Sequence, residues 1–198
     1  MTYTAHRHAA FVGVVSIALG ASAFAGITPS SAPAGFDSVA TLNGGAGTPH
    51  NPSRWFSIED GQGQYTAWAN KKIDFNVTLD TTPREYLVGV TAKNWTSAEL
   101  PPDYTQFKVG VSLDNQFLDY LYIDASDDVW STSWIDVGEL AGDATITLNW
   151  VNDSYTPDKY DANIALGAVQ FAATIPAPAP IALLLAGFGL AAPREKRR

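Results

Sequence analysis

Short segments of alternating apolar and polar residues recur along this chain, and they limit its fold more than any other feature. The clearest of these segments has apolar residues at Phe107, Val109, Val111 and Leu113. A period of two puts one face of a strand in a core. At least about seven such segments, with turn signals every eight to twelve residues and no convincing amphipathic helix, predict an all-β fold. We expect a single antiparallel β-sandwich of the jelly-roll type.

The composition agrees with a turn-rich β protein and limits the partners. The 198 residues include 16 Gly, 12 Pro and no Cys, which excludes disulfides and thiolate metal sites. Residues 26–180 contain 7 Lys/Arg and 19 Asp/Glu, a balance of −12. Such a body should repel nucleic acid and anionic lipid, and it suits cations or neutral partners.

The N-terminus has the features of a secretory signal peptide over residues 1–25. Arg7 lies in a weakly basic region, residues 9–20 are apolar, and Ala23 and Ala25 form a small-x-small cleavage site. The apolar run is short for a bilayer core of about 30 Å. We therefore expect export, and the lack of Cys favours a Gram-negative envelope or medium. Residues 26–53 are predicted to be a leader rich in Gly, Pro and Ser, with a mobile first part.

The C-terminal residues 174–198 form a three-part segment. A Pro-Ala spacer precedes the apolar run 181–192 and a basic end, whose charges favour transient anchoring in the inner membrane. The defining residues are Pro176, Pro178, Arg194, Arg197 and Arg198. This order resembles the PEP-CTERM sorting signals of exopolysaccharide-producing Gram-negative bacteria, although Ala177 replaces the usual Glu. The resemblance implies recognition by an exosortase and delivery to the cell surface or extracellular matrix. A plain membrane anchor is the alternative.

The second half carries another ordered set of motifs. Trp130 and Trp134 precede an Ala141-Gly142 turn, a Thr-rich strand, the loop 152–155 and a last strand that begins at Asn163. This order resembles β-sandwich carbohydrate-binding modules of the xylan- and β-glucan-binding kind, most specifically over its last 50 or so residues. The resemblance implies a jelly roll over residues 54–173, calcium ions and sugar sites on loops. At Gly167 many members instead carry an acidic ligand of a structural calcium.

The stretch WVNDSYTPDKYDANI, residues 150–164, gathers oxygen donors in one loop. Calcium prefers six to eight oxygen ligands, which Asn152, Asp153, Asp158 and Asp161 could partly supply. The spacing is not that of an EF-hand. The alternative is a polar turn whose Asp residues bond their own backbone. Together with the resemblance, the loop predicts calcium as a cofactor. A second acidic loop, residues 124–128, is more typical of a solvated turn.

Aromatic residues near turns are candidate sugar platforms, because rings stack on the apolar faces of sugars. Tyr155 and Tyr160 share the acidic loop and are predicted first, followed by Trp95, Tyr104 and Trp130. No Gly-x-Ser-x-Gly motif occurs, and the three His residues lie at positions 6, 8 and 50, away from the body. Nothing marks a pair of catalytic carboxylates either. The sequence therefore predicts a protein that is not an enzyme.

These observations predict an exported, non-catalytic, calcium-dependent carbohydrate-binding protein. Its partner would be a polysaccharide such as xylan, a β-glucan or the exopolysaccharide of its own cell. The alternative is a structural matrix or surface protein with the same sandwich, in which the acidic loop serves only the fold or protein contacts.

Overall fold

The computed structural model describes residues 27, 29–50, 55–58, 64–67, 71–95, 99–126 and 128–176, with backbone alone for 55–58 and 64–67. The predicted signal peptide with Ala23 and Ala25 lies outside these residues, as does the tail with Pro178, Arg194, Arg197 and Arg198. Within the described ranges, no helix is long and apolar enough to cross a membrane.

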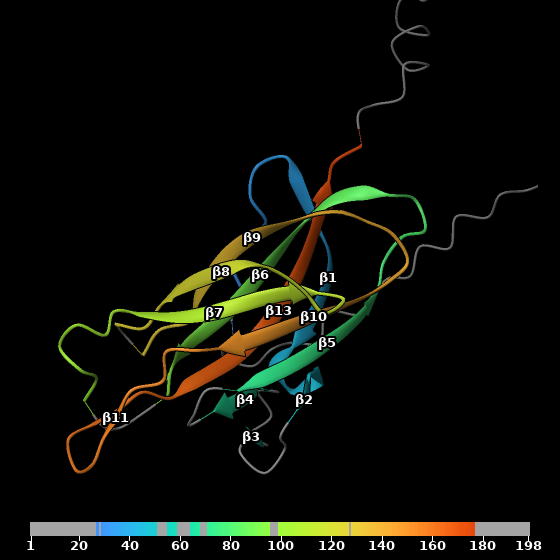
Figure 1. Ribbon diagram of the computed structural model, residues 1–198. Helices are drawn as coiled ribbons and strands as arrows, with labels where there is room; N and C mark the ends of the chain where they lie inside the picture. Colours follow the sequence, from blue (N-terminus) through green and yellow to red (C-terminus); the bar gives the residue numbers. More distant parts are fainter. Residues whose placement is uncertain are drawn as a thin grey trace, which may run out of the picture.

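Two antiparallel sheets pack face to face, which confirms the predicted sandwich (Figure 1). One sheet has the order β3-β4-β13-β6-β9, and β1 also pairs with β13. Its strands are β1 (Phe36–Asn43), β3 (Trp55–Ile58), β4 (Gln64–Ala67), β6 (Arg84–Asn94), β9 (Ser131–Leu140) and β13 (Ile164–Thr174). The other has the order β2-β5-β10-β7-β8. Its strands are β2 (Thr48–Pro49), β5 (Lys72–Thr78), β7 (Gln106–Leu113), β8 (Gln116–Asp124) and β10 (Asp143–Trp150).

The alternating residues form the core between the sheets, as the pattern predicts. Phe75, Ile146 and Val111 point inward from the five-stranded sheet and are fully buried. Val90 and Phe171 do the same from the six-stranded sheet. Because successive side chains of a strand point to opposite faces, the intervening residues define an outer face on each sheet.

Tight turns set the register of neighbouring strands. Asp114 and Asn115 join β7 to β8 with positive φ of 47° and 69°, a conformation that suits a two-residue hairpin and that Asn and Asp tolerate. Gly142, with φ of 72°, lies in the turn between β9 and β10.

The sandwich begins before residue 54, where the sequence placed its boundary. Strand β1 lies inside the predicted leader and pairs along β13 from Phe36 opposite Thr174 to Asn43 opposite Ala168. A short 3-10 helix, η1 (Gly44–Ala46), and β2 follow. The small and polar residues of β1 give a weak alternation, which is why composition suggested a leader there.

Candidate functional site

The acidic loop joins β10 to β13 at one end of the sandwich, where Figure 1 shows it projecting beside the label β11. It contains a small hairpin of β11 (Tyr155–Thr156) and β12 (Tyr160–Asp161). Asp158 occupies the turn with φ of 57°, and Lys159 N donates to the Thr156 carbonyl at 3.1 Å. The loop is thus an ordered excursion at the rim, which we call the rim loop (residues 151–163).

Asn152 anchors the rim loop to strand β7. Its Oδ1 accepts hydrogen bonds from Lys108 N at 2.7 Å, Trp150 Nε1 at 3.0 Å and the Tyr104 hydroxyl at 3.3 Å. Its Nδ2 donates to the Gln106 carbonyl at 2.8 Å. Both ends of the amide are engaged, so the structure gives Asn152 a structural role in place of the predicted metal ligation.

Two of the predicted carboxylates come together behind this anchor. Burial raises the pKa of Asp153 above its ordinary value, and the negative charge of Asp161 raises it further, while the Ser154 N–H acts in the opposite direction. Asp161 Oδ2 accepts a hydrogen bond from Asn163 Nδ2 at 3.0 Å. The acid pair therefore holds two like charges in a partly buried place, where a cation would relieve their repulsion.

The donor set fits a cation only in part. Among the described residues, no three His, Cys, Asp or Glu side chains gather closely enough to hold a metal, so Asp158 does not join the pair. Asn163 is 4% exposed, and its Oδ1 finds no hydrogen-bond partner among the described residues. Rotation of this amide would turn Oδ1 toward Asp161. Asp153, Asp161 and Asn163 are thus suitable oxygen ligands, and backbone carbonyls and water would have to complete the shell.

Three of the five predicted aromatic residues lie around the rim loop. Tyr155 is 66% exposed, and Tyr160 is half-buried with Lys159 Nζ 5.0 Å from its ring centroid. Trp95 is half-buried, and its backbone N–H donates to the Asn163 carbonyl at 2.8 Å. Tyr155 is the ring most open to a ligand.

The other two predicted platforms pack against the protein. The Tyr104 ring meets Phe107 edge-on at 5.9 Å, and burial raises the pKa of its hydroxyl, which stays a protonated donor to Asn152. Trp130 lies against Gly167, where an added Cβ would come within 2.8 Å of its ring. A side chain at position 167 would therefore clash, so the place of the acidic ligand expected in relatives is filled here.

The second acidic loop forms a turn, in agreement with the interpretation favoured from sequence. Asp124 Oδ1 accepts hydrogen bonds from the Ser126 hydroxyl at 2.6 Å and N–H at 2.9 Å, and these bonds lower the pKa of Asp124. Asp128 forms an ion pair with Lys93 at 2.7 Å. Asp127 lies outside the described residues.

Sequence reasoning missed a row of exposed rings on the outer face of the five-stranded sheet. Phe117, Tyr120 and Tyr122 of β8 are 53%, 38% and 50% exposed, and Lys108 Nζ lies 4.0 Å from the Tyr120 ring centroid. Tyr120 and Tyr122 alternate with the buried Leu121 and Ile123, so the period-two pattern held the signal. We call Phe117, Tyr120 and Tyr122 the aromatic row.

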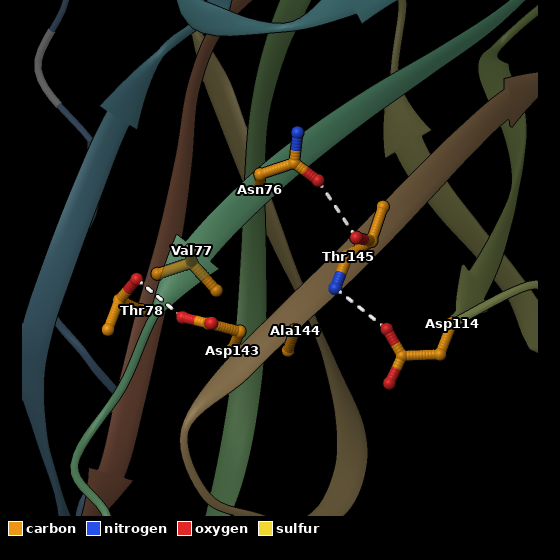
Figure 2. Close-up of a pocket in the computed structure, with 7 residues that line it drawn as sticks. All are labelled: Asn76, Val77, Thr78, Asp114, Asp143, Ala144 and Thr145. Atoms are coloured by element: carbon orange, nitrogen blue, oxygen red, sulfur yellow. Dashed lines mark hydrogen bonds between the residues drawn. The ribbon is translucent and has the colours of Figure 1, made fainter.

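Hollows lie at both ends of this outer face. One, of about 230 Å³, is lined by Tyr122, Lys108, Gln106, Asp103 and Asn152 among others, so it joins the aromatic row to the base of the rim loop. The larger, of about 350 Å³, lies at the opposite end of the sheet. Figure 2 shows it lined by Asn76, Thr78, Asp114, Asp143 and Thr145, with Val77 and Ala144. Their hydroxyl, amide and carboxylate groups largely bond one another, so we take the smaller hollow as the better candidate.

No family model and no curated protein matches the sequence. The fold is similar to a solved carbohydrate-binding module, CBM36, in complex with calcium and xylotriose. The TM-score is 0.50 at 10% identity, over 67% of this chain and 99% of that one. A CBM36-1 domain of a multidomain xylanase from the hindgut metagenome of Trinervitermes trinervoides gives 0.47 at 11% identity, over 67% and 94%. CsCBM6-3 from Clostridium stercorarium, in complex with cellobiose, gives 0.45 at 11% identity, over 67% and 92%. The similarity to the CBM36 structure agrees with the β-sandwich fold of this chain.

Proposed function

We propose that this chain is a non-catalytic carbohydrate-binding protein whose rim loop binds polysaccharide with the help of calcium. One observation carries the proposal: the rim loop sets the exposed Tyr155 and the half-buried Tyr160 in the same short hairpin as Asp161, whose charge acts on Asp153. A ring for stacking beside oxygens that can hold a cation is the combination a sugar site requires. Similarity to the solved modules supports the fold on which this site would rest.

In this proposal each residue has a separate task. Asp153 and Asp161, with Asn163, would hold the cation, which supplies positive charge toward sugar hydroxyls when bound. Tyr155 would stack on the apolar face of a sugar ring. Asn152 would keep the loop in place through its bonds to β7. No bond is made or broken in the ligand.

The aromatic row extends the same function along the sheet. One of its rings, Tyr122, lines the hollow at the base of the rim loop, and Lys108 and Gln106 offer hydrogen-bond donors there. A polysaccharide chain held at the rim would reach these rings, which would add affinity without calcium. The proposed ligands are neutral polysaccharides such as xylan or a β-glucan, and the host's exopolysaccharide.

The expected setting is outside the cell. The signal peptide and the PEP-CTERM-like tail would direct the chain through the inner membrane to an exosortase and onward to the surface or matrix. Mass spectrometry of the exported protein tests this part, because it should show cleavage after Ala25. A protein retained intact in the cytoplasm would contradict it.

We expect glycan binding to fall by at least about tenfold in EDTA and in Asp161→Asn. EDTA removes the cation, and the substitution removes one of the two carboxylates that would hold it. The matched control Asp158→Asn removes a charge from the same hairpin and should leave binding unchanged. Affinity electrophoresis in gels with xylan or β-glucan measures these effects. Undiminished binding by Asp161→Asn would show that the rim cation plays no part. Binding of no glycan at all would favour the structural matrix protein.

Tyr122→Ala is expected to weaken binding about three- to tenfold both with calcium and in EDTA, because stacking on this ring does not involve the cation. The control Val129→Ala also shortens an exposed apolar side chain, one that does not belong to the aromatic row. The same gels test this difference. Equal effects of the two substitutions would remove the aromatic row from the site.

A further inference from the structure

An N-terminal arm, residues 27–33 with residue 28 outside the described residues, crosses the outer face of the six-stranded sheet. Ile27 is 3% exposed, and its Cγ2 lies 2.9 Å from where a Cβ on Gly167 would stand. Just beyond the arm, the Gly35 carbonyl accepts a hydrogen bond from Ile175 N at 3.1 Å. The arm therefore runs across this face from Gly167 of β13, past Thr132 of β9 at Ser30, to the end of β13 near Ile175.

The arm covers a strip of this outer face, which we call the groove, with small residues of β13 below it and Trp130 and Trp134 beside it. Outward residues of β13 are fully buried although they face away from the core; they are Ala165, Ala168 and Ala172. Trp134 of β9 lies flat on Gly89, whose added Cβ would be 2.8 Å from three atoms of the ring. Trp130 packs against the same Gly167 as Ile27.

The polar groups of this groove are uncharged, and they can form hydrogen bonds with the hydroxyl groups of a ligand. Trp134 Nε1 donates to the Ser30 hydroxyl at 3.2 Å, and Ser30 N donates to Thr132 Oγ1 at 3.2 Å. Thr132 also shares a hydrogen bond of 2.8 Å with the fully buried Thr91. Gln170 is 6% exposed, and its Oε1 has no hydrogen-bond partner among the described residues. Such an unfilled buried acceptor indicates that the arm satisfies the groove incompletely.

We infer that this groove is a second polysaccharide site, closed in the resting protein by the N-terminal arm. An indole, two threonine hydroxyls and a carboxamide recognise a neutral, hydroxyl-rich chain, and the Ser30 hydroxyl takes the place of one ligand hydroxyl. The ligand class is a neutral polysaccharide. This inference rests on the proposed function only for the class of ligand. The groove contains no residue of the rim loop and uses no cation.

The arm is suited to open. Its described anchors are one apolar side chain, Ile27, and the hydrogen bonds of Ser30. The arm ends at Pro33, and Gly35 follows with a φ of 90°, a conformation that glycine adopts without strain. A ligand that binds only the open form has its affinity reduced by the open fraction, so unseating the arm should strengthen binding.

The test compares full-length Ile27→Asp with full-length Val39→Asp, which adds the same charge at an exposed apolar residue of β1. Affinity for soluble xylan and soluble β-glucan is measured in EDTA, together with acrylamide quenching of tryptophan fluorescence. We expect Ile27→Asp to raise quenching and to raise EDTA-resistant affinity at least about tenfold over wild type, and Val39→Asp to change neither. Adding Gln170→Leu to Ile27→Asp should cancel much of the gain, because it removes the free acceptor.

Increased quenching without increased affinity would overturn the inference, since the groove would then be open and still not bind. If Ile27→Asp loses its cooperative unfolding transition, Ser30→Ala replaces it. That variant removes the hydroxyl bonded to Trp134 and should give a smaller gain in EDTA-resistant affinity. If it gives no gain, the inference is overturned as well. Wild-type binding in calcium reports on the rim loop, so the failure of the proposed function appears there and is distinguishable from the failure of the groove.

Discussion

Asp153→Asn is expected to raise the melting temperature in EDTA at pH 7 and to abolish the further rise that calcium gives the wild type. Burial and the charge of Asp161 both raise the pKa of Asp153, so its ionised form is disfavoured in the fold. Asparagine removes that cost together with a cation ligand. Calcium at about 100 times its Kd would stabilise the wild type by about 2.7 kcal/mol. For a body of this size that is a shift of several degrees.

The pH dependence has a defined sign. When folding raises the pKa of a carboxyl group, the protein loses stability as the pH increases. The loss begins near the pKa of the unfolded state, about 4, and continues through the pKa of the folded state. In EDTA the advantage of Asp153→Asn should therefore be largest at neutral pH and vanish below about pH 4. Differential scanning fluorimetry from pH 3 to 8 measures this, with Asp158→Asn as the control of equal charge change. A calcium response that survives in Asp153→Asn would contradict the assignment of the pair.

Trp150→Ala is expected to destabilise the fold by about 4 kcal/mol, because it empties a core position next to the rim loop. Trp150 is 1% exposed and meets Phe107 edge-on at 6.0 Å. Its Nε1 also donates to Asn152 and to the Tyr104 hydroxyl. The substitution therefore removes core volume and one support of the loop's anchor together.

Urea denaturation followed by circular dichroism measures the loss as a change in midpoint at constant m-value. Trp150→Phe separates the two contributions, because it keeps an aromatic ring and removes the Nε1 donor. It should cost about 1–2 kcal/mol more than its reduced volume alone. A loss below about 2 kcal/mol in Trp150→Ala would show that the residue supports the core much less than its burial implies.

Strand periodicity predicted the sandwich because burial between two sheets acts directly on the residue pattern. The inward residues of β5, β7 and β10 follow it closely. Strand β1 was missed because its own residues are mostly small or polar and show only a weak alternation. The burial of Ile27 was missed because its contacts are long-range. Ile27 packs where Gly167 and Trp130 meet, and both are far away in sequence.

Within the site, residue type predicted less than geometry. Asn152 and Tyr104 have the chemistry of a ligand and a platform, yet the fold turns both inward, where they bond each other and Trp150. Asp153 and Asp161 are eight positions apart in the sequence, and the hairpin between them brings their charges together. Sequence supplies such candidates, and backbone geometry decides which of them meet.

Isothermal titration calorimetry of the full chain with soluble xylan and soluble β-glucan, in calcium and in EDTA, tests the central claim most directly. We predict saturable binding in calcium to at least one of these glycans, weakened at least about tenfold in EDTA and in Asp161→Asn. No heat of binding to either glycan in calcium, from a protein that unfolds cooperatively, would contradict the account.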